Sequence, residues 1–507
     1  MHHKDIKRQI RKQLKKEYPN WKRLNKKDKK SIARMVLDEV VSDYDFTKQV
    51  DTPAHELLGI ENQLPTSGIM NLEQMARFIE NHNNSKLFKL YSKRPSRHIR
   101  DKELRFIDEI LDNQIINKLL SYHGYSPAMR DFLPSNFLRA ELLRAIKYPE
   151  ISYRKFCGDD KAYKDHKEHN DYTGMAQKQN RAFIGLPLNR KQMISHIQLC
   201  QFRSSLTFAQ VVNLTVYILH HFNQYGFFEG GVLHCVDSSE LAVDCQQLLA
   251  TLEIKGQKIR IYDDIDCDCG KRRNKRDKSA YVVGYRMHTL TAINAKTGHS
   301  FPLISLLAPA NHHDSNFLLP LVRLGKAMGI DIKLITADEA YHDNDGSLLE
   351  ETGVNLIKPP SSKVAVPENV DTETMHVTFD EFCEIPMDYI GVEGQCHEFK
   401  CGAASGECPR SDSCPQYRHI GFDNGRFQRI LYGSQEVIQA LDIRKNGERP
   451  FNLLKKREGL EPVRVRSQHG ILARCTFSTL STLLLEMAGT RKKKKKKHIQ
   501  MALLEAA

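Results

Sequence analysis

The chain has 507 residues, 40% of them hydrophobic and 27% charged, which is enough for a large core divided over two or three domains. The mean hydropathy is -0.51 and apolar runs fall far short of the roughly 20 residues of a bilayer span, so we expect neither a membrane protein nor a secreted one. Twelve cysteines are too few for a disulfide scaffold in a chain of this length. Reduced thiols and a cytoplasmic setting are expected.

The net charge of +14 is concentrated at the two ends of the chain. Residues 1–30 carry a net charge of +10 and residues 491–507, which include six consecutive lysines, carry +6, so the remainder is nearly neutral. Basic arms on a neutral body are typical of proteins that hold a polyanion without reading its sequence. For the lysine run, a merely solvated and disordered tail is the alternative.

Residues 31–225 are predicted to be mainly helical. Apolar residues recur at helical spacing, with turn residues between them, over 31–41, 70–80, 101–120, 137–148 and 206–223.

After residue 230 the pattern changes to short strands. Residues 232–236 form an apolar run that ends at Asp237, and 332–336 form another that runs into Asp338. Between them we expect a weak helix over 240–252, a polar loop over 257–278, a hairpin of 282–294 with 301–307, and a helix over 314–328. A short helix over 347–352, a strand over 354–357 and a final helix from about Glu448 complete a mixed sheet covered by helices.

Three carboxylates stand at the ends of these elements. Asp237 and Asp338 end strands and Glu448 opens a helix, and such oxygen ligands suit Mg²⁺ or Mn²⁺ in phosphodiester chemistry. A solvated acid at a strand end is the alternative for each of them. Glu240, Asp244 and Glu339 are nearby competitors for the metal role.

Several motifs around these acids resemble those of one family. Arg444-x3-Glu448-x6-Lys455 is similar to the Y-x2-R-x3-E-x6-K signature of the insertion-sequence DDE transposases. The segments Gly-Tyr-Arg-Met-His at 284–288, Pro-Leu at 302–303, Ala-Asn-His-His-Asp-Ser at 310–315 and Ala-Asp-Glu-Ala-Tyr at 337–341 also resemble that family. The resemblance covers about 230–485, and it departs from the signature at Leu441, where the family has tyrosine.

The resemblance implies a ribonuclease-H-like α/β catalytic domain over 230–490, preceded by a helical region that binds DNA ends. Asp237, Asp338 and Glu448 would hold two Mg²⁺ or Mn²⁺ ions, and Arg444 and Lys455 would contact DNA. The implied partners are double-stranded DNA, as terminal inverted repeats and target, and a second copy of the chain at synapsis, in the nucleoid of a bacterial host. A catalytically silent DNA-binding relative and a two-metal nuclease without strand transfer remain the alternatives.

A cysteine-rich stretch fills about 360–440, before the glutamate. Cys396, Cys401, Cys408 and Cys414 offer the four soft ligands of a structural Zn²⁺ site, although without the paired C-x2-C spacing. The alternative interpretation is that these four cysteines are reduced thiols that bind no metal.

A basic loop lies between the first two strands. It holds Lys271, Arg272, Arg273, Lys275 and Arg276, which could meet DNA phosphates beside the first aspartate. A solvated loop is the alternative.

Overall fold

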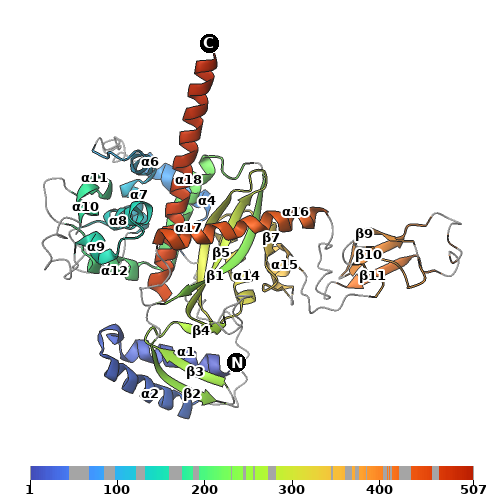
Figure 1. Ribbon diagram of the computed structural model, residues 1–507, viewed down its shortest axis with the longest axis horizontal. Coiled ribbons are helices and arrows are strands. Elements are labelled where there is room, and N and C mark those ends of the chain that lie inside the picture. Colours follow the sequence, from blue (N-terminus) through green and yellow to red (C-terminus); the bar gives the residue numbers. More distant parts are fainter. Residues whose placement is uncertain are drawn as a thin grey trace.

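The computed structural model describes residues 2–44, 68–84, 98–120, 132–158, 174–186, 193–229, 231–243, 247–254, 257–271, 281–343, 346–359, 368–371, 376–383, 385–394, 396–403, 408, 410, 414–421, 435–458 and 468–505. Within these residues the chain is mixed α/β, with one large sheet, two small ones and helices around them (Figure 1). The expected α/β class with a mixed sheet is confirmed.

The large sheet is both antiparallel and parallel. Its strands are β1 (Val232–Ala242), β4 (Asp268–Lys271), β5 (Tyr281–Asn294), β6 (Ser300–Pro309), β7 (Leu334–Ala337) and β8 (Asn355–Ile357). The order is β4-β5-β1-β7-β8, and β6 pairs with β5 on the side away from β1. β5 is antiparallel to β1, β4 and β6, whereas β7 is parallel to both β1 and β8.

The β5–β6 hairpin forms where the sequence predicts it. Most residues of both strands are buried, which suits their nearly unbroken apolar runs. In the turn, the side chain of Asn294 accepts hydrogen bonds from the backbone N–H groups of Lys296 and Thr297, at 3.1 and 3.0 Å.

Two expectations between β1 and β5 are wrong. Residues 240–252 are not helical, because β1 continues to Ala242 and β2 (Leu248–Ile254) follows. The expected polar loop contains β3 (Gln257–Tyr262), which pairs antiparallel with β2. Ile259 and Ile261 alternate with polar residues and bury one face of this hairpin, which is the period of a strand.

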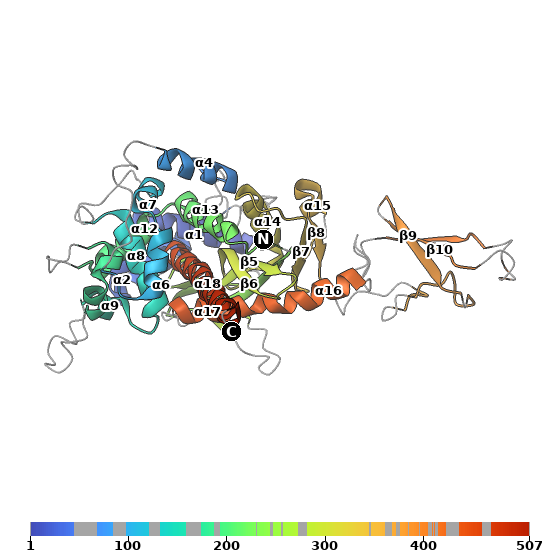
Figure 2. The same ribbon diagram turned by 90° about the horizontal axis from the view of Figure 1, so that it is seen from above.

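The helices lie against the large sheet and beside it (Figure 2). They are α4 (Leu72–Asn83), α6 (Lys102–Ile110), α7 (Asn113–Leu119), α8 (Pro134–Lys147), α9 (Tyr153–Cys157), α10 (Met175–Gln179), α11 (Arg181–Ile184), α12 (His196–Ser205), α13 (Phe208–Gln224), α14 (Leu318–Ala327), α15 (Ser347–Thr352), α16 (Gln435–Arg444), α17 (Arg449–Glu458) and α18 (Gln468–Glu505). Helices α4 to α15, α17 and α18 share one hydrophobic core with the sheet, so the helical region does not have a core of its own. Helix α16 packs in a separate small cluster with Ile357 of β8.

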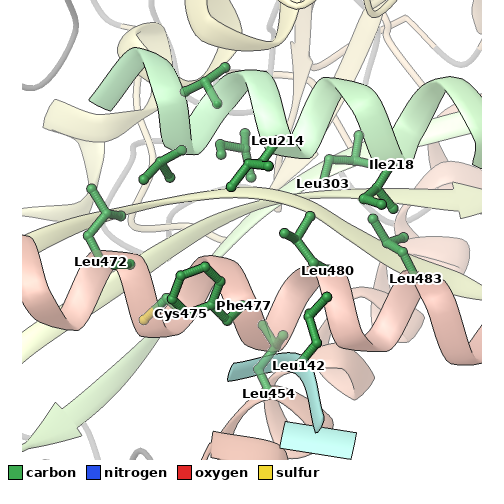
Figure 3. Packing of buried hydrophobic residues seen from close by; sticks show 14 of the residues in the cluster. Leu142, Leu214, Ile218, Leu303, Leu454, Leu472, Cys475, Phe477, Leu480 and Leu483 are labelled. Atoms are coloured by element: carbon green, nitrogen blue, oxygen red, sulfur yellow. The ribbon is translucent and has the colours of Figure 1, made fainter. Parts of the chain in front are cut away.

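Helix α18 is the centre of this core. Figure 3 shows Phe477, Leu480 and Leu483 facing Leu214 and Ile218 of α13. Residues Gln468–Gly489 are long and apolar enough to cross a membrane, but most of this segment is buried inside the protein. Its burial is that of a core helix. The side chains of the basic tail, 491–507, lie outside the described residues.

The N-terminal residues differ from the expected basic arm. They form α1 (His2–Glu17) and α2 (Lys26–Ser42), joined by a short 3-10 helix, and both pack on the β2–β3 hairpin. Ile6, Ile10 and Leu14 are fully buried because their spacing of four residues places them on one face of α1. The high charge of this segment obscured that apolar stripe.

Several N-terminal cations are neutralised within the protein. The loop between β3 and β4 carries buried aspartates, and Lys29 and Lys15 lie 2.7 Å from Asp263 and Asp266, respectively. Lys7 forms an ion pair with Asp268, and burial lowers the pKa of this lysine to about 8. Much of the local charge therefore anchors α1 and α2.

The third sheet consists of β9 (Met387–Glu393), β10 (Cys396–Cys401) and β11 (Tyr417–Gly421), all antiparallel. It lies beyond α16, away from the other two sheets (Figures 1 and 2).

We predict that Ile10→Ala loosens the N-terminal unit, because truncation of a fully buried side chain costs about 2–5 kcal/mol. Backbone hydrogen exchange should accelerate in α1, α2 and the β2–β3 hairpin while α18 stays protected. Lys12→Ala, an exposed position on the same helix, is the control. Equal exchange in both variants would show that α1 does not hold this unit together.

Candidate functional site

The two aspartates lie on neighbouring strands of the large sheet. Val236 of β1 is in register with Ala337 of β7, and Asp237 and Asp338 are the next residues of these parallel strands. Adjacent strands are about 5 Å apart, so the two backbones are close at this point. Asp338 directly follows β7 as expected, whereas Asp237 lies within β1, which continues for five more residues.

Glu448 reaches the same place from the segment of α16, α17 and the 3-10 turn η7 (Lys445–Glu448) between them. This turn packs on β1 and β5. A Cβ added to Gly447 would lie 2.3 Å from the Sγ of Cys235, so only glycine allows so close an approach. Cys235 and Asp237 alternate onto the same face of β1, which is therefore the face that Glu448 approaches. Helix α17 begins at Arg449, as Pro450 predicts.

The pKa of Asp237 is shifted by Asp338, Glu448 and Arg444, which shows that these groups lie near it. Burial, together with the negative charges of Asp338 and Glu448, raises the pKa of Asp237 to about 7. The backbone N–H of Ser238, which donates to the carboxylate at 2.7 Å, and the guanidinium of Arg444 oppose that rise. All three predicted carboxylates and Arg444 therefore act on one another.

The three carboxylates converge without touching. The carboxylate oxygens of Asp237, Asp338 and Glu448 are not all within 4.8 Å of one another. In the described part of the chain, the side chains whose ligand atoms do lie this close together are Glu393, Glu398 and His419 on the small sheet. Like charges at short range repel, which favours such a separation until a cation balances them. Asp237, Asp338 and Glu448 are the residues that could hold divalent ions at this edge of β1 and β7.

A polar network supports the strand that carries Asp237. Arg286 of β5 donates to the buried Asp314 at 2.6 Å, and the hydroxyl of Ser238 donates to the other oxygen of Asp314 at 3.3 Å. Beside this pair, Nδ1 of His288 lies 2.9 Å from the hydroxyl of Tyr341. Burial lowers the pKa of His288 to about 3, so the ring is neutral. The network fixes β1, β5 and the turn after Asp338 relative to one another.

The sequence alone predicts no role for the residues of this network. The signal in the sequence that could indicate such a role is position. The segments that carry the family resemblance contain all four residues, Arg286, His288, Asp314 and Tyr341. Their burial, which depends on tertiary packing, could not be read from it.

Arg444 and Lys455 lie on the two helices that flank Glu448. The Nε of Arg444 is buried and lacks a hydrogen-bond partner within the described residues. Lys455 is on α17, about 10 Å along the helix from Glu448. Leu441, at the position of the signature tyrosine, packs with Leu233 and Leu334 against the sheet.

Lys271, the described member of the basic loop, is not beside Asp237. Lys271 is exposed at the end of β4 and pairs with Tyr281 of β5, whereas Asp237 pairs with Thr289. Tyr281 and Thr289 are eight residues apart along β5, which corresponds to about 26 Å of strand. The remaining members, Arg272, Arg273, Lys275 and Arg276, lie outside the described residues.

The four thiols expected to share zinc are not brought together. Cys396 and Cys401 are at opposite ends of β10, about 16 Å apart, because five residues of strand separate them. Cys401, Cys408 and Cys414 lie toward the other end of this sheet from Cys396.

The other acids considered for the metal role are Glu240, Glu339 and Asp244. Glu240 lies 3.6 Å from the guanidinium of Arg286 and belongs to the supporting network. Glu339 is exposed beside Asp338, and Asp244 lies outside the described residues.

Comparison with protein-family models gives no match for this chain, and comparison with curated proteins gives none either.

The raised pKa of Asp237 predicts a pH-dependent stability. The folded state retains a proton that the unfolded state loses between about pH 4 and pH 7, so this group destabilises the fold progressively as pH rises through that range. Without divalent ions, Asp237→Asn should remove this slope and raise the unfolding midpoint at pH 8 by a few degrees, since ~1 kcal/mol corresponds to about 2–4 °C. Calorimetry at pH 5 and 8 measures it, with the exposed Asp331→Asn as control. A midpoint of Asp237→Asn at or below that of the wild type at pH 8 would contradict the burial of a charged Asp237.

We predict that Gly447→Ala destabilises the protein by about 1–3 kcal/mol, because the new methyl group overlaps the sulfur of Cys235. Cys235→Ala removes that sulfur, so the double variant should recover most of the loss. Gly489→Ala is the control, because nothing lies within 4 Å of an added Cβ there. The unfolding midpoints of these variants test whether this contact fixes the turn before Glu448, and a double variant no better than Gly447→Ala alone would refute it.

Proposed function

We propose that this protein is a DNA transposase of the insertion-sequence DDE type. The observation that carries the proposal is the convergence of Asp338, Glu448 and Arg444 on the buried carboxylate of Asp237. Three acids and one arginine with the spacing of the family signature act on one another across the edge of a mixed sheet.

The order of strands supports a ribonuclease-H-like catalytic domain. β6, β5 and β1 form an antiparallel meander, and the parallel strands β7 and β8 continue the sheet beyond β1. The proposed catalytic aspartates occupy β1 and the end of β7, the central pair of this order. Ligand sites in open sheets favour a point where the order of strands reverses direction, as it does at β1.

In the proposed mechanism Asp237, Asp338 and Glu448 would hold two Mg²⁺ or Mn²⁺ ions, which would supply activation of the attacking oxygen and charge stabilisation of the leaving one. Asp237 must lose its proton to serve as a ligand, and with a pKa near 7 it does so at neutral pH. Arg444, which is only partly buried, would neutralise and orient a DNA phosphate with its guanidinium group.

Double-stranded DNA is the proposed partner, both as the terminal inverted repeats of the element and as target. The N-terminal unit still offers exposed cations to phosphates, including Lys12, Lys16, Lys26, Lys27 and Lys30, although its other lysines are paired internally. Two copies would act at synapsis, and the setting would be the nucleoid of a bacterial cytoplasm. The helical region from α4 to α13 is proposed to help position DNA ends.

The test uses the full chain with a plasmid that carries the DNA flanking this reading frame. We expect Mg²⁺- or Mn²⁺-dependent cleavage at the element ends, followed by joining of the freed ends to a second plasmid. Asp237→Asn, Asp338→Asn and Glu448→Gln should each lower cleavage by at least ~1000-fold while DNA binding in a gel-shift assay stays within about twofold, since each removes a ligand charge and little volume.

Glu339→Gln is the matched control, because it removes an exposed charge next to Asp338 and should leave cleavage unchanged. Cleavage without joining would support a nuclease with the same site. DNA binding without any metal-dependent cleavage would support a silent DNA-binding relative. Full activity of a triad variant would remove that residue from the site.

A further inference from the structure

Lys358 is a buried cation with no carboxylate paired to it. It directly follows β8, and only 9% of its surface is exposed. Within the described residues its Nζ forms no ion pair, and its hydrogen-bond partner is Nδ1 of His342, at 3.3 Å. Burial lowers the pKa of Lys358, and the negative charge of Glu339 only partly opposes this. A buried charge is costly unless an opposite charge pairs with it, so this lysine points to an anionic ligand.

Two histidines stand beside Lys358. The rings of His342 and His313 are stacked, with their centres 5.5 Å apart. His342 follows the turn after β7, whereas His313 caps the 3-10 turn η6 (Asp314–Phe317). Three nitrogen-bearing side chains thus meet from three separate segments, and no carboxylate of the described part of the chain forms an ion pair with any of them.

The hydrogen bonds of the two rings leave an N–H donor on each. Nδ1 of His342 accepts from the ammonium group of Lys358, so the proton of the neutral ring is on Nε2. Burial, together with the charges of Lys358 and His313, lowers the pKa of His342 and favours this neutral ring. Nδ1 of His313 accepts from the backbone N–H of Ser315 at 3.3 Å, which likewise places the proton on Nε2. The cluster therefore offers donors to a ligand: one ammonium group and two imidazole N–H groups.

The cluster lies beyond the strand ends that carry the proposed metal site. β8 is parallel to β7, and the register of the two strands puts Lys358 level with Ala337, the residue before Asp338. Neighbouring strands are about 5 Å apart. The pKa of His342 also responds to the negative charge of Asp338, so the ring lies near that carboxylate. The three donors therefore border the acids.

We propose that Lys358, His342 and His313 bind a phosphate group of the DNA backbone beside the proposed metal site. The inference rests on the proposed function for the identity of the anion as DNA. A phosphate suits the cluster because its oxygens accept several hydrogen bonds at once and its charge balances that of the lysine. Lys358 would supply the charge, and the two imidazole groups would orient the phosphate. His313 is exposed, so the site is open to the surface.

The first experiment measures the binding of inorganic phosphate to the full chain. The unfolding midpoint is compared in phosphate and in chloride at equal ionic strength, without divalent ions. Phosphate should raise the midpoint of the wild type by more than that of Lys358→Met, because the general stabilising effect of phosphate acts on both proteins alike. Lys333→Met is the matched control, since it removes an exposed charge just before the opposite end of β7.

A second variant keeps the test independent of the folding of Lys358→Met. His313→Ala changes an exposed position and removes one of the three donors. It should reduce the phosphate effect on the unfolding midpoint, although by less than Lys358→Met does, because the charge of the lysine remains.

The second experiment measures the affinity of the full chain for a DNA duplex. Lys358→Met should lower the affinity by roughly tenfold, because it removes a hydrogen bond from a charged donor to a phosphate. The slope of the logarithm of affinity against the logarithm of salt concentration should also fall by about one. Lys333→Met should change neither quantity.

Two results would overturn the proposal. One is an equal phosphate effect in the wild type, Lys358→Met and His313→Ala. The other is loss of the phosphate effect in Lys358→Met with unchanged DNA affinity, which would leave free phosphate as the ligand. Loss of both in Lys358→Met supports the site even if the wild type does not cleave DNA, so the test is separate from that of the transposase activity. Cleavage by the wild type, with an equal phosphate effect in all three proteins, would overturn the site alone.

Discussion

The site depends on one close contact, the packing of the turn before Glu448 directly onto β1. Gly447 lies so near the sulfur of Cys235 that no side chain fits between them. The parallel pairing of β1 with β7 brings the second aspartate to the same place. These two interactions connect three distant parts of the chain, and each carboxylate is separated from the next in sequence by a segment with its own fold.

The convergence has an energetic cost that the rest of the molecule offsets. A carboxylate with a pKa near 7 is destabilising when charged, and two further acids add to the repulsion. The buried Arg286–Asp314 pair holds the neighbouring strands, and the apolar half of α18 packs the helices against the sheet. The acids therefore sit on a packed core, and their clustered negative charge attracts cations.

Elements whose apolar pattern agrees with their environment were predictable. The β5–β6 hairpin, β7, α15 with its glycine stop at Gly353, and the start of α17 follow from periodicity and turn chemistry alone. The sequence predicts a charged arm in place of helix α1, because the aspartates that neutralise Lys7 and Lys15 come from a loop about 250 residues later. Spacing along the sequence likewise does not reveal that Cys396 and Cys401 stand at opposite ends of β10.

The two small units beside the large sheet solve the same problem differently. The N-terminal unit covers its hairpin with two amphipathic helices and ties them down with buried ion pairs, so it needs no further crosslink. The β9–β11 unit has no helix over either face among the described residues and keeps apolar side chains exposed. Among the described residues, the β9–β11 unit therefore depends on the small apolar cluster of Val377, Met387, Phe399 and Ile420.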